Sequence, residues 1–402
     1  MPNREHVRQH TPRILELACL LVAGLVLAAV VAVVTSVWMA GVAGSAAVGI
    51  FWAVMAVVVL GGIGGLLVWA HCSGNGLAAR TPYEPRGEVR RVASRDGTEI
   101  HVEVEGPQDP DLTVVFVHGW TCSTAVWEGQ RNALIGHGVR TVCYDQRGHG
   151  RSGWKGMAAG DRGVRQLADD LEAVIAATAP TGRLVLVGHS MGGMTIMAFT
   201  ERHLRLVEER VEGVLFLGTS AGPLSETLTL GLPAALTPLH KLVRRHAVSM
   251  ITLLGFMPKP MARLLGIGPY LFFGNLMAVS SKSDLAKSLT ARGVWGTPLS
   301  VAGRALDAVL THDERDAVPS LDPARVVTVS GDADHLVPIA DQVELARLVG
   351  DARHVIVEGA GHMIAQEALE TTNTELLALI ELVRDGTHDE QDDVAEVVVV
   401  PA

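Results

Sequence analysis

Short apolar runs recur through most of the chain and are typical of buried strands. They are rich in valine and leucine and lie at residues 112–117, 139–144, 184–187, 214–217, 326–329 and 354–357. Between several of them, apolar positions recur at helical spacing, as in residues 163–177 and 191–203. Strands that alternate with helices predict an α/β fold class, with a mostly parallel twisted sheet and helices on both faces.

The first 71 residues follow a different pattern, because charged residues are almost absent after Arg13. Between Arg13 and His71 the single charged residue is Glu16, which leaves an apolar tract of nearly sixty residues. One membrane crossing needs about 20 such residues, and a turn rich in glycine at residues 41–45 divides the tract. We therefore expect an N-terminal transmembrane helical hairpin that anchors the chain in a membrane. Its two spans are expected at residues 15–40 and 46–70.

The distribution of arginine predicts the side of the membrane. The loop between the two spans lacks lysine and arginine, whereas four arginines follow the second span, at positions 80, 86, 90 and 91. By the positive-inside rule both ends face the cytoplasm, so we expect a multi-pass protein of the cell membrane whose globular part is cytoplasmic. A cleaved signal peptide is the alternative for the first span. That span is longer than a signal core, and the second span would still return the chain to the cytoplasm.

Changes of pattern divide the rest of the chain into segments. An Asp96-Gly97 pair between two alternating runs predicts a hairpin at the start of the sheet. Strand and helix later cease to alternate over about one hundred apolar, largely helical residues, and the end of the chain is acidic. The expected segments are a linker at 72–87, a first sheet part at 88–224, a helical insertion at 225–319, a second sheet part at 320–385 and an acidic disordered tail at 386–402.

The motif Gly188-His189-Ser190-Met191-Gly192 follows a predicted strand and precedes a predicted helix. A G-x-S-x-G sequence in that context is a nucleophile elbow, in which a sharp turn lifts the serine hydroxyl clear of the sheet. Side chains at Gly188 and Gly192 would collide with the neighbouring backbone there. Ser190 is therefore the candidate nucleophile.

On these residues the chain resembles the α/β-hydrolase superfamily with a serine nucleophile, which includes esterases and lipases. The resemblance covers roughly residues 88–385 and implies that the helical insertion forms a cap over the site. It also implies the order serine, acid, histidine along the chain. A G-x-x-D-x-x-x-P pattern follows the strand at 326–329 and identifies Asp334 as the acid, with Asp332 as a helper or loop residue. His362, in a glycine-flanked loop after the last strand, is the base.

Some relatives carry the acid after the preceding strand, but residues 217–220 of this chain contain no carboxylate. The oxyanion hole implied by the resemblance uses the backbone N–H of Met191 and that of Trp120 in the loop after His118-Gly119. The indole of Trp120 either forms a wall of the acyl site or packs in the core. The turn at residues 145–152 is expected to brace loops, and Cys122 to be a small buried residue rather than a second nucleophile.

Composition excludes several other kinds of site. The net charge is −10 and no basic cluster suits nucleic acid. Four scattered cysteines do not form a disulfide framework, which favours a reducing compartment. Neither H-E-x-x-H, paired C-x-x-C nor a P-loop occurs, so we expect no metal and no cofactor. The sequence leaves the oligomeric state open.

These features predict a membrane-anchored serine hydrolase that cleaves carboxylic esters through an acyl-enzyme. The anchor and the apolar insertion favour a lipophilic, small-molecule ester and contact with the lipid bilayer. A perhydrolase or another acyl transferase with the same three residues is the alternative. A non-catalytic binding protein that keeps the fold is the least favoured hypothesis, because all three catalytic positions are filled.

Overall fold

The computed structural model describes residues 83–227, 283–350, 352–386 and 397–401. The expected membrane spans at 15–40 and 46–70 lie outside the described residues, as does most of the helical insertion, at 228–282. Within the described ranges no helix has the length and hydropathy needed to cross a bilayer.

A nine-stranded sheet forms the centre of the described chain, in the order β1-β2-β4-β3-β5-β6-β7-β8-β9. β1 and β2 form the hairpin expected at Asp96-Gly97, and the β1–β2 and β2–β4 pairs are antiparallel. All later pairs are parallel, from β3–β4 through β8–β9. The strands are β1 (Glu88–Ala93), β2 (Glu99–Glu105), β3 (Leu112–Val117), β4 (Arg140–Tyr144), β5 (Arg183–His189), β6 (Val211–Leu217), β7 (Val326–Gly331), β8 (Arg353–Glu358) and β9 (Val397–Pro401). The α/β class and the mostly parallel sheet are therefore confirmed.

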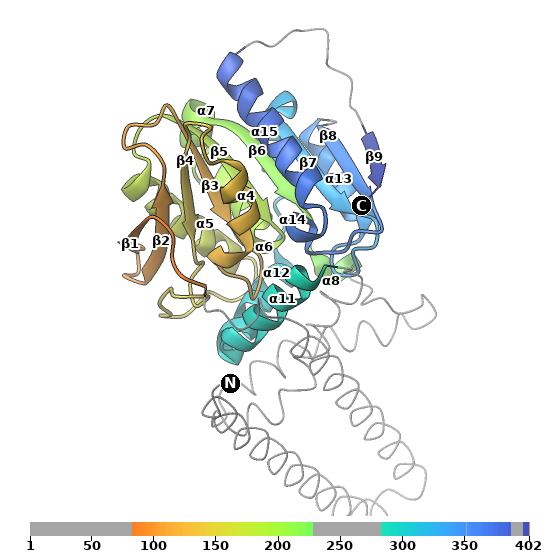
Figure 1. Ribbon diagram of the computed structural model, residues 1–402. Helices are drawn as coiled ribbons and strands as arrows, with labels where there is room; N and C mark the ends of the chain where they lie inside the picture. The colour runs from red at the N-terminus through yellow and green to blue at the C-terminus, as the bar shows by residue number, and fades with distance from the viewer. Residues whose placement is uncertain (1–82, 228–282, 351, 387–396, 402) are drawn as a thin grey trace, which may run out of the picture. The chain divides into compact units, whose positions relative to one another are not determined.

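Helices cover both faces of this sheet (Figure 1). α4 and α15 pack together on one face, whereas α5 and α6 pack together on the other. Their apolar sides bury the valine- and leucine-rich strands, and β3 and β4 are buried along their whole length. The helices are α4 (Glu128–Ala133), α5 (Arg162–Thr178), α6 (Met191–Arg202), α7 (Leu204–Arg210), α8 (Leu224–Thr227), α11 (Asp284–Gly296), α12 (Leu299–Thr311), α13 (Ile339–Val349), α14 (Ile364–Glu367) and α15 (Leu369–Asp385). Short 3₁₀ turns lie at Thr124–Trp127, Val318–Ser320 and Pro323–Arg325.

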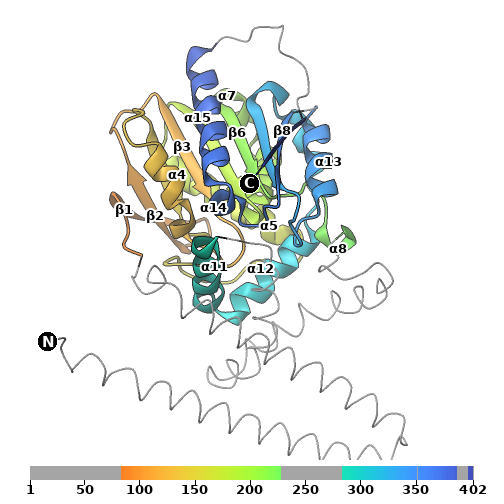
Figure 2. The ribbon, with the colours of Figure 1, turned by 45° about the vertical axis from the view of Figure 1, so that its right-hand side comes forward.

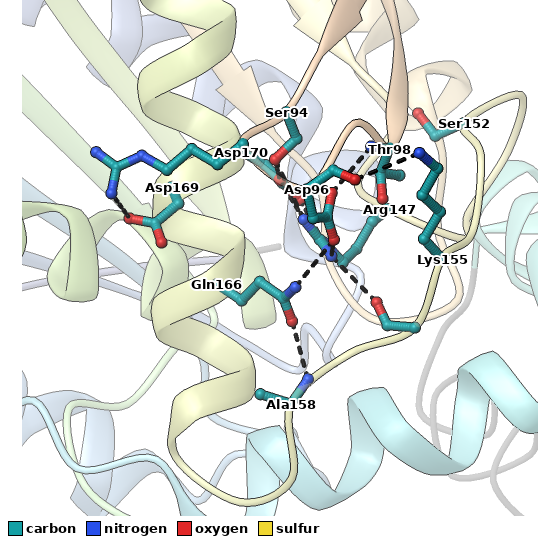
Figure 3. A network of polar contacts seen from close by, with 12 residues as sticks. Ser94, Asp96, Thr98, Arg147, Ser152, Lys155, Ala158, Gln166, Asp169 and Asp170 are labelled. Atoms are coloured by element: carbon teal, nitrogen blue, oxygen red, sulfur yellow. Dashed lines mark hydrogen bonds and ion pairs between the residues drawn. The ribbon is translucent and has the colours of Figure 1, made fainter.

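The turn after β4 is held by a buried ion-pair network (Figure 3). Arg147 donates two hydrogen bonds of 2.6 Å to Asp170 on α5 and one of 2.8 Å to Asp96 in the β1–β2 hairpin. Asp145 accepts the backbone N–H of Thr124 at 2.8 Å and that of Arg151 at 2.7 Å. Burial raises the pKa of Asp170, so its carboxylate depends on the Arg147 guanidinium. These contacts fit the bracing role expected for the turn.

The C-terminal tail differs from the expectation. Residues 397–401 do not behave as a solvated tail but form β9, which pairs in parallel with β8. Their sequence is V-V-V-V-P, and β-branched residues favour a pleated, half-buried surface. The acidic residues on which the expectation of disorder was based precede this strand, and most of them lie at 387–396, outside the described residues.

The parts of the helical insertion that the structure describes are α8, α11, α12 and the segment that follows α12. α11 and α12 lie at the edge of the sheet where the parallel strands end (Figure 2). Since ligands of open α/β sheets bind outside the carboxyl ends of the strands, these two helices approach the expected site.

Candidate active site

Ser190 lies on a strained turn between β5 and α6. Its backbone angles are φ 52° and ψ −120°, a combination that residues with a side chain rarely adopt. A Cβ at Gly188 would lie 2.7 Å from the backbone nitrogen of Gly193, and one at Gly192 would lie 1.9 Å from the carbonyl oxygen of Val117. Both glycines of the motif are therefore required for the close approach of strand and helix, as the sequence indicated.

The structure brings Ser190, His362 and Asp334 together in one hydrogen-bonded chain. His362 Nε2 lies 3.0 Å from Ser190 Oγ, and His362 Nδ1 lies 2.8 Å from Asp334 Oδ2. Ser190 and His362 are 172 residues apart in the sequence. His362 follows β8 and Asp334 follows β7, so parallel strands deliver all three to one edge of the sheet. All three residues are buried.

Asp334 is fixed by the turn that carries it. Its Oδ1 accepts the backbone N–H groups of Leu336 and Val337, at 2.8 and 2.9 Å, which leaves Oδ2 to face His362. In this arrangement His362 carries its proton on Nδ1 and donates it in a hydrogen bond to the carboxylate of Asp334. Nε2 is then free to accept the proton of Ser190. Asp332 is exposed and accepts the N–H of Gly359 instead, so it does not contact His362.

Two residues that the sequence did not single out hold the loop of His362. His189 Nε2 donates a hydrogen bond of 2.9 Å to the backbone oxygen of His362. Burial, assisted by the neighbouring His362, lowers the pKa of His189 to about 3, so the ring is neutral near pH 7 and has one proton to donate. Glu367 accepts the N–H groups of Gly361 and Met363, at 2.9 and 3.0 Å. The position of His189 inside the elbow motif was the one available signal.

The loop after β3 lies against the nucleophile. A Cβ added to Gly119 would lie 3.2 Å from Cβ of Ser190, so Gly119, the residue before Trp120, lies against the nucleophile. Met191 is the first residue of α6, where backbone N–H groups have no partner within the helix. The indole Nε1 of Trp120 donates to the backbone oxygen of Ala302 on α12 at 3.0 Å. Met191 follows Ser190 directly and Trp120 follows Gly119, so the backbone N–H groups of both remain the candidates for the oxyanion hole.

Other candidate groups are not arranged for chemistry. Cys122 is buried, and burial raises the pKa of its thiol to about 12, so a thiolate nucleophile is disfavoured near pH 7. Over the described ranges no cluster of three or more histidine, cysteine, aspartate or glutamate side chains is placed to hold a metal ion.

Comparison with known proteins gives one consistent result. A profile described as the alpha/beta hydrolase family matches residues 114–374. A non-heme haloperoxidase of Rhodococcus erythropolis is 29% identical over 296 residues, which are 72% of this chain and 98% of the relative. A bifunctional esterase/perhydrolase of Acinetobacter calcoaceticus is 35% identical over 114 residues, 28% of this chain and 39% of the relative. The solved structure of an esterase from Exiguobacterium antarcticum superimposes with a TM-score of 0.57 at 22% identity, over 74% of this chain and 100% of the esterase.

Proposed function

Because this chain belongs to the alpha/beta hydrolase family, we propose that it hydrolyses carboxylic esters with Ser190 as nucleophile, His362 as base and Asp334 as orienting acid. The observation that carries the proposal is the continuous chain of hydrogen bonds from Ser190 Oγ to Asp334 Oδ2 through both nitrogens of His362. A serine hydroxyl is a weak nucleophile until a base within about 3 Å accepts its proton. A noncatalytic binding protein of the same fold would not need the strained conformation of Ser190.

The chain is an enzyme of the carboxylic ester hydrolase type, consistent with its family and with esterases among its relatives and structural neighbours. The proposed reaction then follows from the geometry. Ser190 Oγ attacks the ester carbonyl carbon while His362 Nε2 takes the hydroxyl proton, and the charge on the carbonyl oxygen is met by the N–H groups of Trp120 and Met191. Asp334 stabilises the imidazolium through Nδ1–H.

The tetrahedral adduct collapses when its bond to the alcohol oxygen breaks, and His362 gives the alcohol its proton. A water molecule, deprotonated by the same Nε2, then attacks the acyl-enzyme. The second tetrahedral adduct releases the carboxylic acid and returns the proton to Ser190. These reaction steps require neither a metal nor a cofactor.

We further propose a lipophilic substrate, on the basis of the apolar residues of the insertion, for example residues 242–257. The test is hydrolysis of p-nitrophenyl esters from acetate to palmitate by the purified full-length protein, with and without detergent. We expect kcat/KM to rise from acetate toward medium or long chains, because each buried methylene contributes about 0.8 kcal/mol. A steady decline from acetate onward would contradict the lipophilic substrate, and no turnover of any ester would contradict the proposed function.

A perhydrolase is the second candidate, since a haloperoxidase and an esterase/perhydrolase are among the relatives. In that reaction hydrogen peroxide replaces water as the acceptor of the acyl group, and a peroxy acid leaves. Bromination of monochlorodimedone in the presence of peroxide, bromide and a short carboxylic acid, assayed beside ester hydrolysis, separates the two. A bromination rate above the hydrolysis rate would favour the second candidate.

We also propose that the first 71 residues attach the enzyme to the cell membrane, with the hydrolase on the cytoplasmic side. The support is the apolar tract and the arginines that follow it. Asp109, in an exposed loop between β2 and β3, is a suitable position for a reporter cysteine. We expect Asp109→Cys to react with a membrane-impermeant maleimide only after the cells are opened. Equal labelling in intact cells would place the hydrolase outside.

A further inference from the structure

The turn that carries Trp120 adopts a conformation that its own sequence disfavours. Residues 119–122, here called the oxyanion turn, are closed by a hydrogen bond of 3.1 Å from Cys122 N to Gly119 O. The third residue is Thr121, with φ 55°, at a position where a turn with positive φ ordinarily carries glycine. In the described chain the other non-glycine residue with positive φ is Ser190. A β-branched residue is strained in this region of backbone conformation.

The hydroxyl of Thr121 makes no hydrogen bond that would offset the strain, among the residues that the structure describes. The residue itself is 2% exposed. A strained conformation persists where the surroundings over-determine it. The contacts that hold the oxyanion turn must therefore come from elsewhere in the fold.

One such contact comes from α12. The indole of Trp120 donates its Nε1–H to the backbone oxygen of Ala302, across 182 residues of sequence. Both residues are buried, at 8% and 1% exposure. A buried indole N–H needs an acceptor, and the backbone oxygen of Ala302 supplies it. The hydrogen bond therefore fixes the side chain of Trp120, the residue whose backbone N–H is the proposed oxyanion donor.

The second contact comes from α11. A Cβ added to Gly293 would lie 1.9 Å from the carbonyl oxygen of Thr121 and 3.1 Å from its carbonyl carbon. Glycine weakens a helix interior relative to alanine, so the presence of Gly293 within α11 is explained by the close approach of the helix to the turn. α11 thus limits the position of the Thr121–Cys122 peptide of the turn.

We propose that α11 and α12 clamp the oxyanion turn, and that Gly293 and the indole of Trp120 are positioning residues for the oxyanion donor of the proposed esterase. The inference rests on the proposed function, because the donor matters only if a carbonyl oxygen becomes charged beside Ser190. Misplacement of a catalytic group by about 1 Å costs on the order of 100-fold in rate. Both helices belong to the helical insertion at 225–319, so the clamp links the insertion to the stabilisation of the transition state.

Two variants with matched controls test the clamp. Gly293→Ala adds a Cβ against Thr121, and Gly296→Ala makes the same change on the same helix where nothing lies within 4 Å. Trp120→Phe keeps the backbone donor and removes the indole hydrogen bond. Trp127→Phe makes the same change at a fully buried indole whose Nε1 has no partner in the described chain.

We expect Gly293→Ala and Trp120→Phe to lower kcat roughly 10- to 100-fold with KM within about threefold, since the loss of one whole donor costs about 10²–10³. Affinity for a trifluoromethyl ketone with the acyl chain of the best ester should fall by the same factor. This ketone forms an oxyanion on addition of Ser190, whereas the substrate ground state does not. Both control variants should stay within about threefold of the wild type in kcat and in inhibitor affinity.

The clamp would be overturned if the test variants matched their controls, or if they raised KM while affinity for the ketone stayed unchanged. Should Gly293→Ala fail to fold, Trp120→Phe against Trp127→Phe decides alone, because both replace a buried indole by a smaller ring. A wild-type protein that hydrolyses no ester contradicts the proposed function itself, and the clamp falls with it. Ester hydrolysis by the wild-type protein therefore distinguishes a failure of the clamp from a failure of the proposed function.

Discussion

Replacement of Ser190 by alanine is expected to lower kcat for ester hydrolysis by roughly 10⁴- to 10⁶-fold. KM should change little, because the hydroxyl that lies 3.0 Å from His362 Nε2 acts in the reaction and not in ground-state binding. A fluorophosphonate probe, which bonds covalently to an activated serine, should label the wild type and not the variant. Stopped assays of p-nitrophenyl ester hydrolysis give kcat, and in-gel fluorescence gives the labelling.

The matched control is Ser220→Ala, which removes a buried hydroxyl in the loop after β6. That hydroxyl bonds to Gly222 and not to His362, so labelling and turnover should survive. The double variant Ser190→Ala with His362→Ala should be no slower than either single variant, since residues that act as a unit are not additive. Persistent labelling of Ser190→Ala would assign the reaction to another residue.

Asp334→Asn is expected to lower kcat by about 10⁴-fold, with the fold intact. Oδ1 of Asp334 accepts two backbone N–H groups, so the amide oxygen of asparagine must take that place. The amide NH₂ then faces His362 Nδ1 and donates to it, which moves the ring proton to Nε2. In that tautomer Nε2 has no lone pair to accept the proton of Ser190. Kinetics at saturating ester, with a thermal melt to exclude unfolding, measure the effect.

Asp332→Asn is the control, because Asp332 is exposed and contacts the N–H of Gly359. We expect its kcat to stay within about threefold of the wild type.

A rescue is also available at Gly218, where an added Cβ would lie 3.6 Å from Asp334 Oδ2 and 3.8 Å from His362 Nδ1. The φ of Gly218 is 55°, which aspartate tolerates better than most residues. Recovery in Asp334→Asn/Gly218→Asp would show that His362 needs a carboxylate at Nδ1; wild-type rates in Asp334→Asn alone would contradict the role.

The parts of the site that the sequence predicted are those whose geometry demands particular residues locally. Gly188 and Gly192 could be recognised because a Cβ at either would strike backbone, and Asp334 because its turn needs Gly331 and Pro338 at fixed offsets. His362 could be recognised from its order and its glycine-flanked loop. The alternation of strand and helix gave the parallel sheet in the same way, since each strand is a short apolar run.

The contacts between distant segments left no such local signal. Nothing near Gly293 in the sequence indicates that its missing side chain makes room for the carbonyl of Thr121, and Trp120 could equally have packed in the core. His189 occupies a position that the motif leaves unspecified, and only the folded structure shows that its ring bonds to the backbone oxygen of His362. β9 was missed because the acidic residues before it dominated the composition, while the partner edge of β8 exists only once the sheet has formed.

The two core segments, one before the insertion and one after it, meet in the sheet at β6 and β7, and this has a consequence for the integrity of the enzyme. β6 ends before the insertion and β7 begins after it, yet the two strands are direct neighbours in register from Val214–Val326 to Leu217–Val329. A protease cut anywhere between residues 228 and 282 would yield one fragment with Ser190 and another with Asp334 and His362. Neither fragment holds the full catalytic apparatus, whereas the shared ladder keeps a nicked chain together. The chain therefore suits the design of a split enzyme, in which activity reports the association of the two fragments.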